Sequence, residues 1–310
     1  MVKYWIFKVI EHKAGKDRLE GIDVYKQRMR QAFWGLKERR RDGRKVANIT
    51  KLERGDYVVF YLAGSEDEQS FLGTAILDSS FYKLGQQEKE KLTRLPFFVA
   101  THGVKFMEID AWDTPVSIRP LIENLQFITN KRNWGSHIQG SITPIPEEDF
   151  NIIISQRGIE EITKLSSTKE PSLTEESSET IVKRKIRDAG FREGIRELYE
   201  YSCAVCGKKR FDRSKHPEAE SAHIYPKEKN GKDDWRNGIS LCRLHHWAFE
   251  KGLFSIRDDY SIIIEDRIRN DDNYKEINSY EGKKIKLPNE KSSAPHPVFL
   301  REHRRIHGLK

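Results

Sequence analysis

Cysteine is scarce in this chain of 310 residues: only three are present, and all lie between residues 203 and 242. Because the three share one motif, none is left for a disulfide, which favours an intracellular protein. No apolar run approaches the roughly 20 residues of a membrane span. The first ten residues, MVKYWIFKVI, are interrupted by Lys8 and lack a small-residue cleavage site, so they predict a strand and not a signal peptide. We therefore expect a cytoplasmic protein without a membrane partner.

The sequence also lacks an internal repeat, a glycine-rich phosphate-binding loop and a serine or cysteine nucleophile motif, which argues against P-loop and covalent-hydrolase chemistry. Positive charge, in contrast, is abundant. The net charge of +8 and the pI near 9.2 suit a polyanionic partner. The length predicts two domains, and a hydrophobic content of 36% is enough for two modest cores.

The most specific motif in the sequence consists of two Cys/His pairs with metal-ligand spacing. Two residues separate Cys203 from Cys206, and two separate Cys242 from His245. A tight turn with this spacing lets both side chains of a pair converge on one tetrahedral Zn²⁺. Three buried apolar cysteines beside a surface histidine would not account for two matched spacings. The pattern therefore predicts a closed structural zinc site with four protein ligands.

The stretch around these pairs, with AHIYP and RNGISLCRLHHWAFEKG, resembles an HNH endonuclease of the ββα-metal type. His223, Asn237 and His246 match the three signature residues, with 13 and then 8 residues between them. The resemblance implies two strands and a helix around a catalytic Mg²⁺ or Mn²⁺. It also implies that His223 is the general base that activates water, that Asn237 holds the loop and the base, and that His246 binds the catalytic metal.

Hydrolysis of a phosphodiester bond requires side chains of the same types. A neutral imidazole can accept a proton from water, and a divalent cation stabilises charge on the phosphate oxygens. Residues 243–251 predict a short helix, so His246 and Glu250 at i and i+4 share one face, which makes Glu250 a second catalytic-metal ligand. The alternative for Glu250 is a solvated carboxylate, which a helix C-terminus disfavours. Many HNH enzymes have Asp where this chain has Ala222, so either Glu250 takes that role or Glu220 helps to order the site.

The first half of the chain predicts a compact mixed barrel with flanking helices. Strands are expected at Tyr4–Ile10, Tyr57–Leu62, Phe71–Leu77, Lys105–Ile109 and Ile142–Pro144, and helices at Asp23–Leu36 and Leu121–Leu125. The order KYWIFKV, RGDYVVFYLAG, FLGTAIL, LQFITNKRNWG and GSITPIPEEDF resembles an EVE domain of the PUA-like superfamily. Relatives in this superfamily bind a modified base, flipped from a duplex or taken from a single strand, with aromatic faces stacked on it.

Aromatic stacking can offset the cost of removing a base from its helix. Trp34 is the first candidate for a pocket wall, because the dense positive run KERRRDGRK follows it. Trp5, Tyr82 and Trp134 are candidates for a second wall and Asn133 for an edge hydrogen bond, with an ordinary core position as the alternative. Phosphate contacts are expected from four residues of the positive run: Arg39, Arg40, Arg41 and Lys45.

A polar segment separates the two halves. Of the 16 residues at 165–180, 12 are Ser, Thr or Glu and none is aromatic, which predicts a flexible tether. We expect an α+β protein with an EVE domain at 1–155, a flexible linker at 156–182 and an HNH domain at 183–310. The second domain is expected to begin with a helix at Ile181–Leu198, to contain strands at Leu253–Ile256 and Ser261–Ile264, and to end with a helix near Pro297–His307.

A base-reading module tethered to a nuclease predicts a modification-dependent restriction endonuclease. The expected substrate is double-stranded DNA that carries a modified cytosine, with cleavage near that base. One HNH site cuts one strand per encounter, so a double-strand break implies a homodimer or two successive events. The alternatives are a DNA- or RNA-binding protein with a degenerate nuclease domain, and an RNA-directed HNH nuclease.

Overall fold

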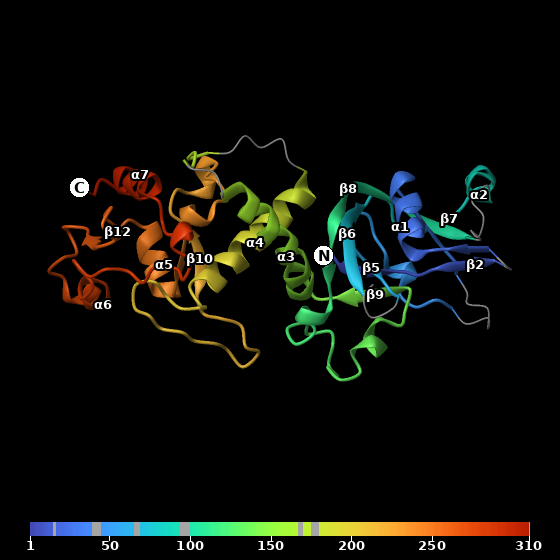
Figure 1. Cartoon of the computed structure of the whole chain (residues 1–310), viewed down its shortest axis with the longest axis horizontal. Coiled ribbons are helices and arrows are strands. Elements are labelled where there is room, and N and C mark those ends of the chain that lie inside the picture. Colours follow the sequence, from blue (N-terminus) through green and yellow to red (C-terminus); the bar gives the residue numbers. More distant parts are fainter. Residues whose placement is uncertain are drawn as a thin grey trace. The chain divides into compact units, whose positions relative to one another are not determined.

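The computed structural model describes residues 1–14, 17–38, 45–64, 69–93, 100–166, 170–174 and 180–309. The chain divides into two compact units (Figure 1). The N-terminal unit comprises Met1–Ile154 with Thr180–Lys185, and the C-terminal unit comprises Ser155–Glu179 with Ile186–Lys310. Both combine helices with strands, so the predicted α+β class is confirmed. Among the described helices, none has the length and apolar character needed to span a lipid bilayer.

The N-terminal unit is built around a curled, half-open sheet of seven strands (Figure 1). Its strands are β1 (Tyr4–Val9), β4 (Phe33–Leu36), β5 (Tyr57–Leu62), β6 (Ser70–Leu77), β7 (Tyr82–Lys83), β8 (His102–Ser117) and β9 (Ile142–Ile145). Their order is β4-β8-β6-β5-β1-β9, with β7 paired to β8. Strands β1 and β5 are parallel, whereas the other pairs are antiparallel. A separate hairpin joins β2 (His12–Ala14) to β3 (Asp17–Leu19).

The core of this unit lies against the sheet and helix α1 (Gly21–Arg30). The largely apolar runs YWIFKV, in which Lys8 is the one charged residue, and YVVFYL form β1 and β5, which is typical of strands buried on both faces. The turn before β5 is fixed by the buried Asp56 carboxylate. This carboxylate accepts hydrogen bonds from Trp5 Nε1 at 2.8 Å and from the Lys3 backbone N–H at 3.0 Å. A second helix, α2 (Gln86–Thr93), follows β7.

The helix predicted at Asp23–Leu36 is wrong in its second half. Helix α1 ends at Arg30, and the following Ala32 has a φ of +48°, which does not continue a right-handed helix. The Phe106 backbone N–H donates to the Ala32 carbonyl at 2.8 Å, and Phe33–Leu36 pairs with β8 as a strand. The predicted helix at Leu121–Leu125 is also wrong, because this region has only a short 3₁₀ turn at Arg119–Leu121.

The first part of the predicted linker is helical. Helix α3 (Glu147–Ser166) extends through it, because Ile159 and Ile162 provide apolar positions at helical spacing that pack on the core of the C-terminal unit. Helix α4 (Ile181–Leu198) crosses α3 at Gly158 and Gly190. A Cβ on either glycine would collide with the backbone of the other helix, so the crossing depends on glycine at both positions.

The C-terminal unit contains two antiparallel hairpins around one hydrophobic core. Its elements after α4 are β10 (Glu220–His223), β11 (Gly238–Leu241), α5 (Arg243–Glu250), β12 (Phe254–Ile256), β13 (Ile262–Ile264), α6 (Lys275–Asn278) and α7 (Pro297–His307). The predicted helices over residues 181–198 and 297–307 and the predicted strand pair near residues 253–264 are confirmed. Two of the cysteines, Cys203 and Cys242, are buried within this core.

Candidate active site and metal centre

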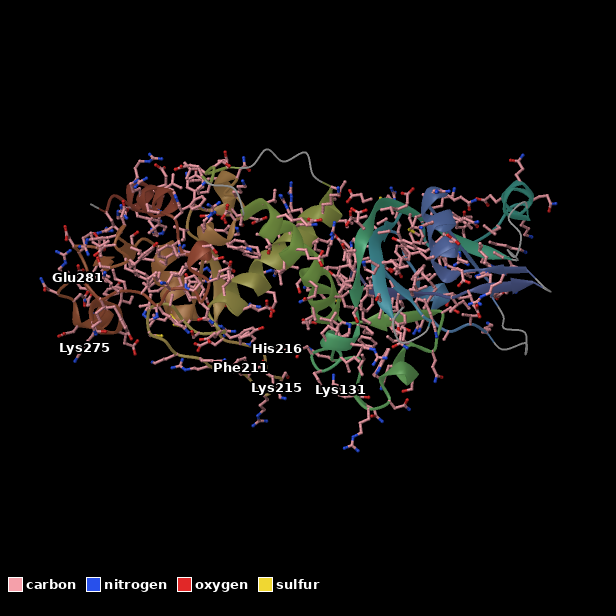
Figure 2. The ribbon with its side chains drawn as sticks, viewed as in Figure 1. Lys131, Phe211, Lys215, His216, Lys275 and Glu281 are labelled. Atoms are coloured by element: carbon pink, nitrogen blue, oxygen red, sulfur yellow. The ribbon has the colours of Figure 1, made fainter. Side chains whose placement is uncertain are left out.

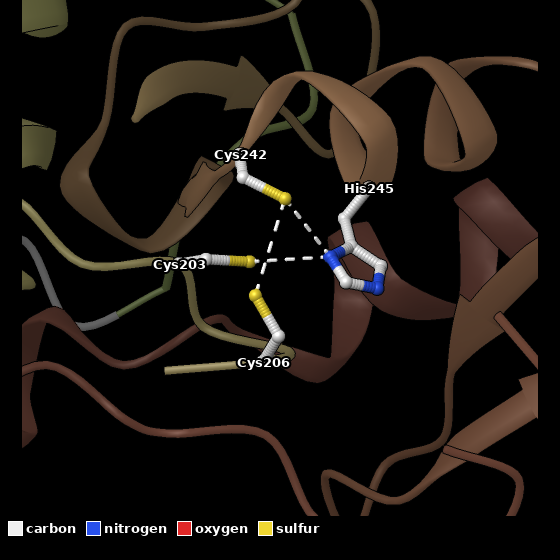
Figure 3. A group of neighbouring side chains, drawn as sticks. All are labelled: Cys203, Cys206, Cys242 and His245. Atoms are coloured by element: carbon white, nitrogen blue, oxygen red, sulfur yellow. Dashed lines mark hydrogen bonds between the residues drawn. The ribbon is translucent and has the colours of Figure 1, made fainter. Parts of the chain in front are cut away.

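Three cysteines and one histidine converge in the C-terminal unit (Figure 3). One ligand atom from each of Cys203, Cys206, Cys242 and His245 lies within 4.8 Å of all the others. The His245 Nδ1 atom is 3.5 Å from the Cys203 sulfur and 3.1 Å from the Cys242 sulfur. Three sulfurs and one imidazole nitrogen form a donor set typical of structural Zn²⁺. The four residues predicted as ligands therefore fit a zinc ion.

Local sequence brings each pair of ligands together. In the first pair, the Gly207 N–H donates to the Cys203 carbonyl at 2.8 Å, and the Cys203 N–H donates to the Lys208 carbonyl at 3.0 Å. Gly207 has a φ of +69°, a conformation that favours glycine and closes this turn. In the second pair, Cys242 immediately precedes α5, and His245 lies on the buried side of that helix's first turn.

The cluster also favours the ionised form of one sulfur. The hydrogen bond with the Cys203 thiol, followed by the hydrogen bond with His245, lowers the pKa of Cys242 to about 3. Ionisation of the Cys242 thiol is therefore favoured relative to a free cysteine. Because the thiolate is the form that binds metals, the electrostatics of the cluster agree with its donor set.

The segment between the two pairs forms a strand, loop, strand and helix. Strands β10 and β11 are antiparallel, with His223 opposite Gly238, and α5 follows directly. Asn237 is completely buried in the loop that joins the strands. Its Oδ1 accepts from the Tyr225 N–H at 2.8 Å, and its Nδ2 donates to the carbonyls of Tyr225 at 3.2 Å and Lys232 at 2.9 Å. These bonds tie the two ends of the loop together.

His223, at the end of β10, contacts a carboxylate and an aromatic ring. Its Nε2 is 2.8 Å from Oδ1 of Asp233, and its ring stacks on Phe191 of α4 with centroids 3.9 Å apart. The Lys227 ammonium donates to the other Asp233 oxygen at 2.6 Å. Burial alone would raise the pKa of Asp233, but the hydrogen bond from His223 and the charge and hydrogen bond of Lys227 outweigh it, so the pKa lies below its usual value.

His246 lies between two carboxylates. Its Nδ1 is 2.6 Å from Oε2 of Glu220, and its Nε2 is 3.2 Å from Oε1 of Glu250. The predicted proximity of His246 and Glu250 at i and i+4 on α5 is therefore observed. An imidazole with carboxylate oxygens is a suitable donor set for a divalent cation. The two carboxylates contact opposite ring nitrogens, and within the described residues only the Cys/His cluster has its ligand atoms converged on one point.

Two tryptophans that were candidates for a wall of the base pocket face the core. Trp5 and Trp34 are each 2% exposed. The Trp5 indole is fixed by its hydrogen bond to Asp56. The Trp34 ring packs against Phe60, with centroids 5.5 Å apart, and the Arg28 guanidinium lies 4.0 Å from its centroid. The alternation of β4 explains this orientation, because Trp34 and Leu36 point inward where a helix had been predicted.

The other residues predicted to contact nucleic acid lie apart from these rings. Tyr82 is half-buried on β7, where its hydroxyl donates to Glu88 at 2.9 Å. Asn133 is exposed, and the half-buried Trp134 begins a 3₁₀ turn before β9. Lys45 is exposed. The other three members of the predicted phosphate-contacting set lie outside the described residues: Arg39, Arg40 and Arg41.

A cavity of about 500 Å³ opens next to Tyr82. Its lining combines apolar and polar side chains of β4, α2, β8 and the segments that follow α1 and β6: Gln31, Ala32, Phe33, Asp78, Glu88, Lys105 and Phe106. Tyr82 touches this lining twice, through its bond to Glu88 and through the Lys105 ammonium, which is 5.7 Å from its ring centroid.

Sequence reasoning missed three residues around His223: Phe191, Lys227 and Asp233. Phe191 belongs to a helix that precedes the HNH motif, so no spacing within the motif pointed to it. Asp233 had a usable signal, because an acidic residue on the short loop between two paired strands can reach the end of either strand. Phe191 and Asp233 contact His223, and Lys227 contacts Asp233, only through the folded arrangement of α4, β10 and the loop.

Comparison with known families agrees with the two units. Residues 3–156 match the EVE domain family, and residues 203–257 match an HNH endonuclease family. The chain therefore belongs with the EVE-domain proteins and also carries an HNH endonuclease domain. The predicted combination of these two domains is confirmed.

Among individual relatives, the chain is 24% identical over 135 residues to the UPF0310 protein PH1033 of Pyrococcus horikoshii, covering 40% of this chain and 85% of that protein. It is 31% identical over 113 residues to a UPF0310 protein of Mycolicibacterium vanbaalenii, covering 34% and 70%. The modification dependent TagI restriction endonuclease is a similar solved structure, with 12% identity, a TM-score of 0.31 and coverage of 97% and 80%. Human THYN1, solved with 5-methylcytosine-containing DNA, has 14% identity, a TM-score of 0.33 and coverage of 55% and 99%.

Proposed function

We propose that this protein is a modification-dependent DNA endonuclease. In this proposal the N-terminal unit takes up a modified cytosine, and the C-terminal unit hydrolyses a phosphodiester bond nearby. The observation that carries the proposal is the arrangement of His223, Asn237 and His246 on a strand, loop, strand and helix stabilised by a Cys₃His cluster. The HNH endonuclease match over residues 203–257 supports the same chemistry.

His223 acts as the general base. It removes a proton from a water molecule, whose oxygen forms a bond to phosphorus while the bond from phosphorus to one deoxyribose oxygen breaks. Asn237 keeps the loop between β10 and β11 closed, which supports a fixed position for the imidazole at the end of β10. The leaving oxygen takes a proton from solvent.

A divalent cation would be held by His246 together with Glu250 or Glu220. Both carboxylates already contact the His246 ring, so either could supply an oxygen ligand next to an imidazole nitrogen. When bound, Mg²⁺ or Mn²⁺ stabilises the negative charge that develops on the phosphate oxygens. Glu220 lies on the strand that ends in His223, which supports the alternative in which it helps to order the site.

For the base, the cavity beside Tyr82 is the best-supported site in the described part of the N-terminal unit. Its apolar floor of Phe33 and Phe106 suits the face of a base, and its polar lining suits edge hydrogen bonds. The EVE resemblance of residues 3–156 supports a modified base as its occupant. Because each HNH site cuts one strand, we propose a homodimer for double-strand cleavage.

Plasmid cleavage tests this proposal. Plasmid DNA with and without cytosine modification should be incubated with the protein in Mg²⁺, Mn²⁺ or no added metal, and only the modified plasmid with metal should be cut. His223→Ala should abolish cleavage. The matched control is His216→Ala, an exposed histidine on the loop after the first cysteine pair (Figure 2), which should cut at the parental rate.

Each of the other results identifies a different function. Specific binding of modified DNA without cleavage under any condition would indicate a reader with a degenerate nuclease domain. Cleavage of RNA with no action on the plasmid would indicate an RNA-directed nuclease. Equal cleavage of both plasmids would remove the modified base from the proposal.

A further inference from the structure

Both carboxylate oxygens of Asp233 take part in hydrogen bonds. Its side chain is 1% exposed, on the loop between β10 and β11. Oδ1 lies 2.8 Å from Nε2 of His223, and Oδ2 accepts from the Lys227 ammonium at 2.6 Å. An ionised carboxylate can only accept hydrogen bonds, so the proton of this contact must lie on Nε2 of His223.

This contact selects one tautomer of the base. A neutral imidazole carries one N–H, so a proton on Nε2 leaves the lone pair on Nδ1. Within the described residues Nδ1 has no hydrogen-bond partner, and it is not among the buried atoms that lack one. Nδ1 is therefore the nitrogen that is free to accept a proton from water.

The orientation of the ring is fixed in two independent ways. Stacking on Phe191, with an interplanar angle of 9°, fixes the plane of the His223 ring. Stacking alone would still permit a 180° flip of the ring about the Cβ–Cγ bond, which leaves the ring plane unchanged but exchanges nitrogen and carbon positions. The hydrogen bond to Asp233 removes that freedom.

The surrounding charges keep this carboxylate ionised. Helix α4 contributes Asp188 and Arg192 to the same electrostatic environment, and the loop contributes Lys227. Burial, followed by the nearby charge of Asp233, raises the pKa of Asp188. Lys227 offsets this like-charge repulsion by its direct contact with Asp233.

We propose that Asp233 is a positioning residue for the nuclease reaction: it holds His223 as the Nε2–H tautomer with Nδ1 directed to water, and Lys227 fixes Asp233 in turn. This inference rests on the proposed function, because it assigns Asp233 to the same hydrolytic step. When His223 has taken the proton, the adjacent carboxylate also stabilises the resulting imidazolium.

The decisive variant is Asp233→Asn, because Lys227 dictates how the new amide lies. The ammonium lies 2.6 Å from Oδ2 of Asp233 and can only donate, so in the variant the amide oxygen faces Lys227 and the amide NH₂ faces His223. Nε2 must then accept, and the proton moves to Nδ1, which can no longer act as the base. We expect kcat to fall roughly 100-fold, the size of a typical general-base contribution, with KM unchanged.

A double variant separates the tautomer from simple packing. With Lys227→Met in the same chain, the amide is free to turn and present its oxygen to Nε2. We expect Asp233→Asn with Lys227→Met to recover about tenfold of the lost rate relative to Asp233→Asn alone. The matched control is Asp234→Asn, since Asp234 is an equally buried neighbour that pairs with Arg236 instead of a histidine.

The tautomer can be measured directly in the full-length protein by two-bond ¹⁵N–¹H spectra of labelled histidine. The parental protein and Asp234→Asn should carry the His223 proton on Nε2, and Asp233→Asn should carry it on Nδ1. A parental proton on Nδ1, or a parental cleavage rate in Asp233→Asn, would overturn the inference. If Asp233→Asn does not fold, the parental spectrum alone decides.

If the proposed nuclease function is wrong, the cleavage experiments give a different result from the one expected when only the role of Asp233 is wrong. In that case the parental protein does not cleave DNA, or His223→Ala cleaves as well as the parental protein, whatever the tautomer of His223. If His223→Ala is inactive while Asp233→Asn retains full activity, the nuclease assignment stands and only the role of Asp233 is wrong.

Discussion

Replacement of two adjacent histidines by alanine should have opposite effects. His245 points into the Cys/His cluster, and its ring is 3% exposed, with edge contacts to Phe254 and Tyr280. His246 is on the other side of α5, partly exposed between two carboxylates. We expect His245→Ala to lose zinc and destabilise the C-terminal unit, and His246→Ala to keep zinc but lose metal-dependent cleavage.

The expected loss of stability in His245→Ala follows from the contribution of bound zinc to folding. Structural zinc contributes roughly 10 to 16 kcal/mol to the folding of zinc-finger peptides, whereas the net stability of a domain is about 5 to 15 kcal/mol. The C-terminal unit has a substantial core of its own, so losing one of four ligands should cost a fraction of the zinc term, on the order of 3 to 5 kcal/mol. For a unit of about 150 residues this corresponds to a fall in Tm of roughly 6 to 20 °C. His246→Ala should change Tm by less than about 4 °C.

Scanning calorimetry and metal analysis of the purified variants test this prediction. The transition of the N-terminal unit serves as an internal reference, because it should be the same in all three proteins. Full zinc occupancy with a parental Tm in His245→Ala would refute the assignment of the cluster as a structural zinc site. Zinc loss in His246→Ala would show that the two sites are not separate.

Three further predictions concern stability. Trp34→Ala should destabilise the N-terminal unit by about 3 to 5 kcal/mol in urea unfolding, because it leaves a large core cavity. Unchanged stability together with a selective loss of binding to modified DNA would contradict this prediction. Gly190→Ala should cost roughly 1 to 3 kcal/mol in the same measurement, since its Cβ meets the backbone of Gly158, and a neutral effect would mean that the helices are not this close. Because the pKa of Asp233 is lowered on folding, its stabilising contribution should be complete above the ordinary carboxyl pKa of about 4 and be lost below it. Asp233→Asn should flatten that part of the pH dependence of Tm, and an identical acid limb in the variant would argue against the ion pair.

Patterns that depend on neighbouring residues were predictable from the sequence. The turn that joins Cys203 to Cys206 and the helix that places His246 beside Glu250 both follow from local spacing, so the metal cluster and one side of the candidate active site could be found without a structure. The same holds for β1 and β5, whose sequences are largely apolar. The identity of the two domains could also be predicted from the sequence, because each unit has its own order of strands and motifs.

Features that depend on distant segments were decided only by the tertiary structure. Residues 33–36 have helical spacing, but their backbone hydrogen bonds are made with β8, some 70 residues later, and this pairing turns Trp34 into the core. Residues 156–166 follow the first domain in sequence, yet Ile162 is buried in the second. Asp233 and Phe191 meet at His223 from a loop and a helix that no local spacing relates. In each case the free energy comes from burial and hydrogen bonds between segments far apart in the chain, and local propensity yields to those contacts.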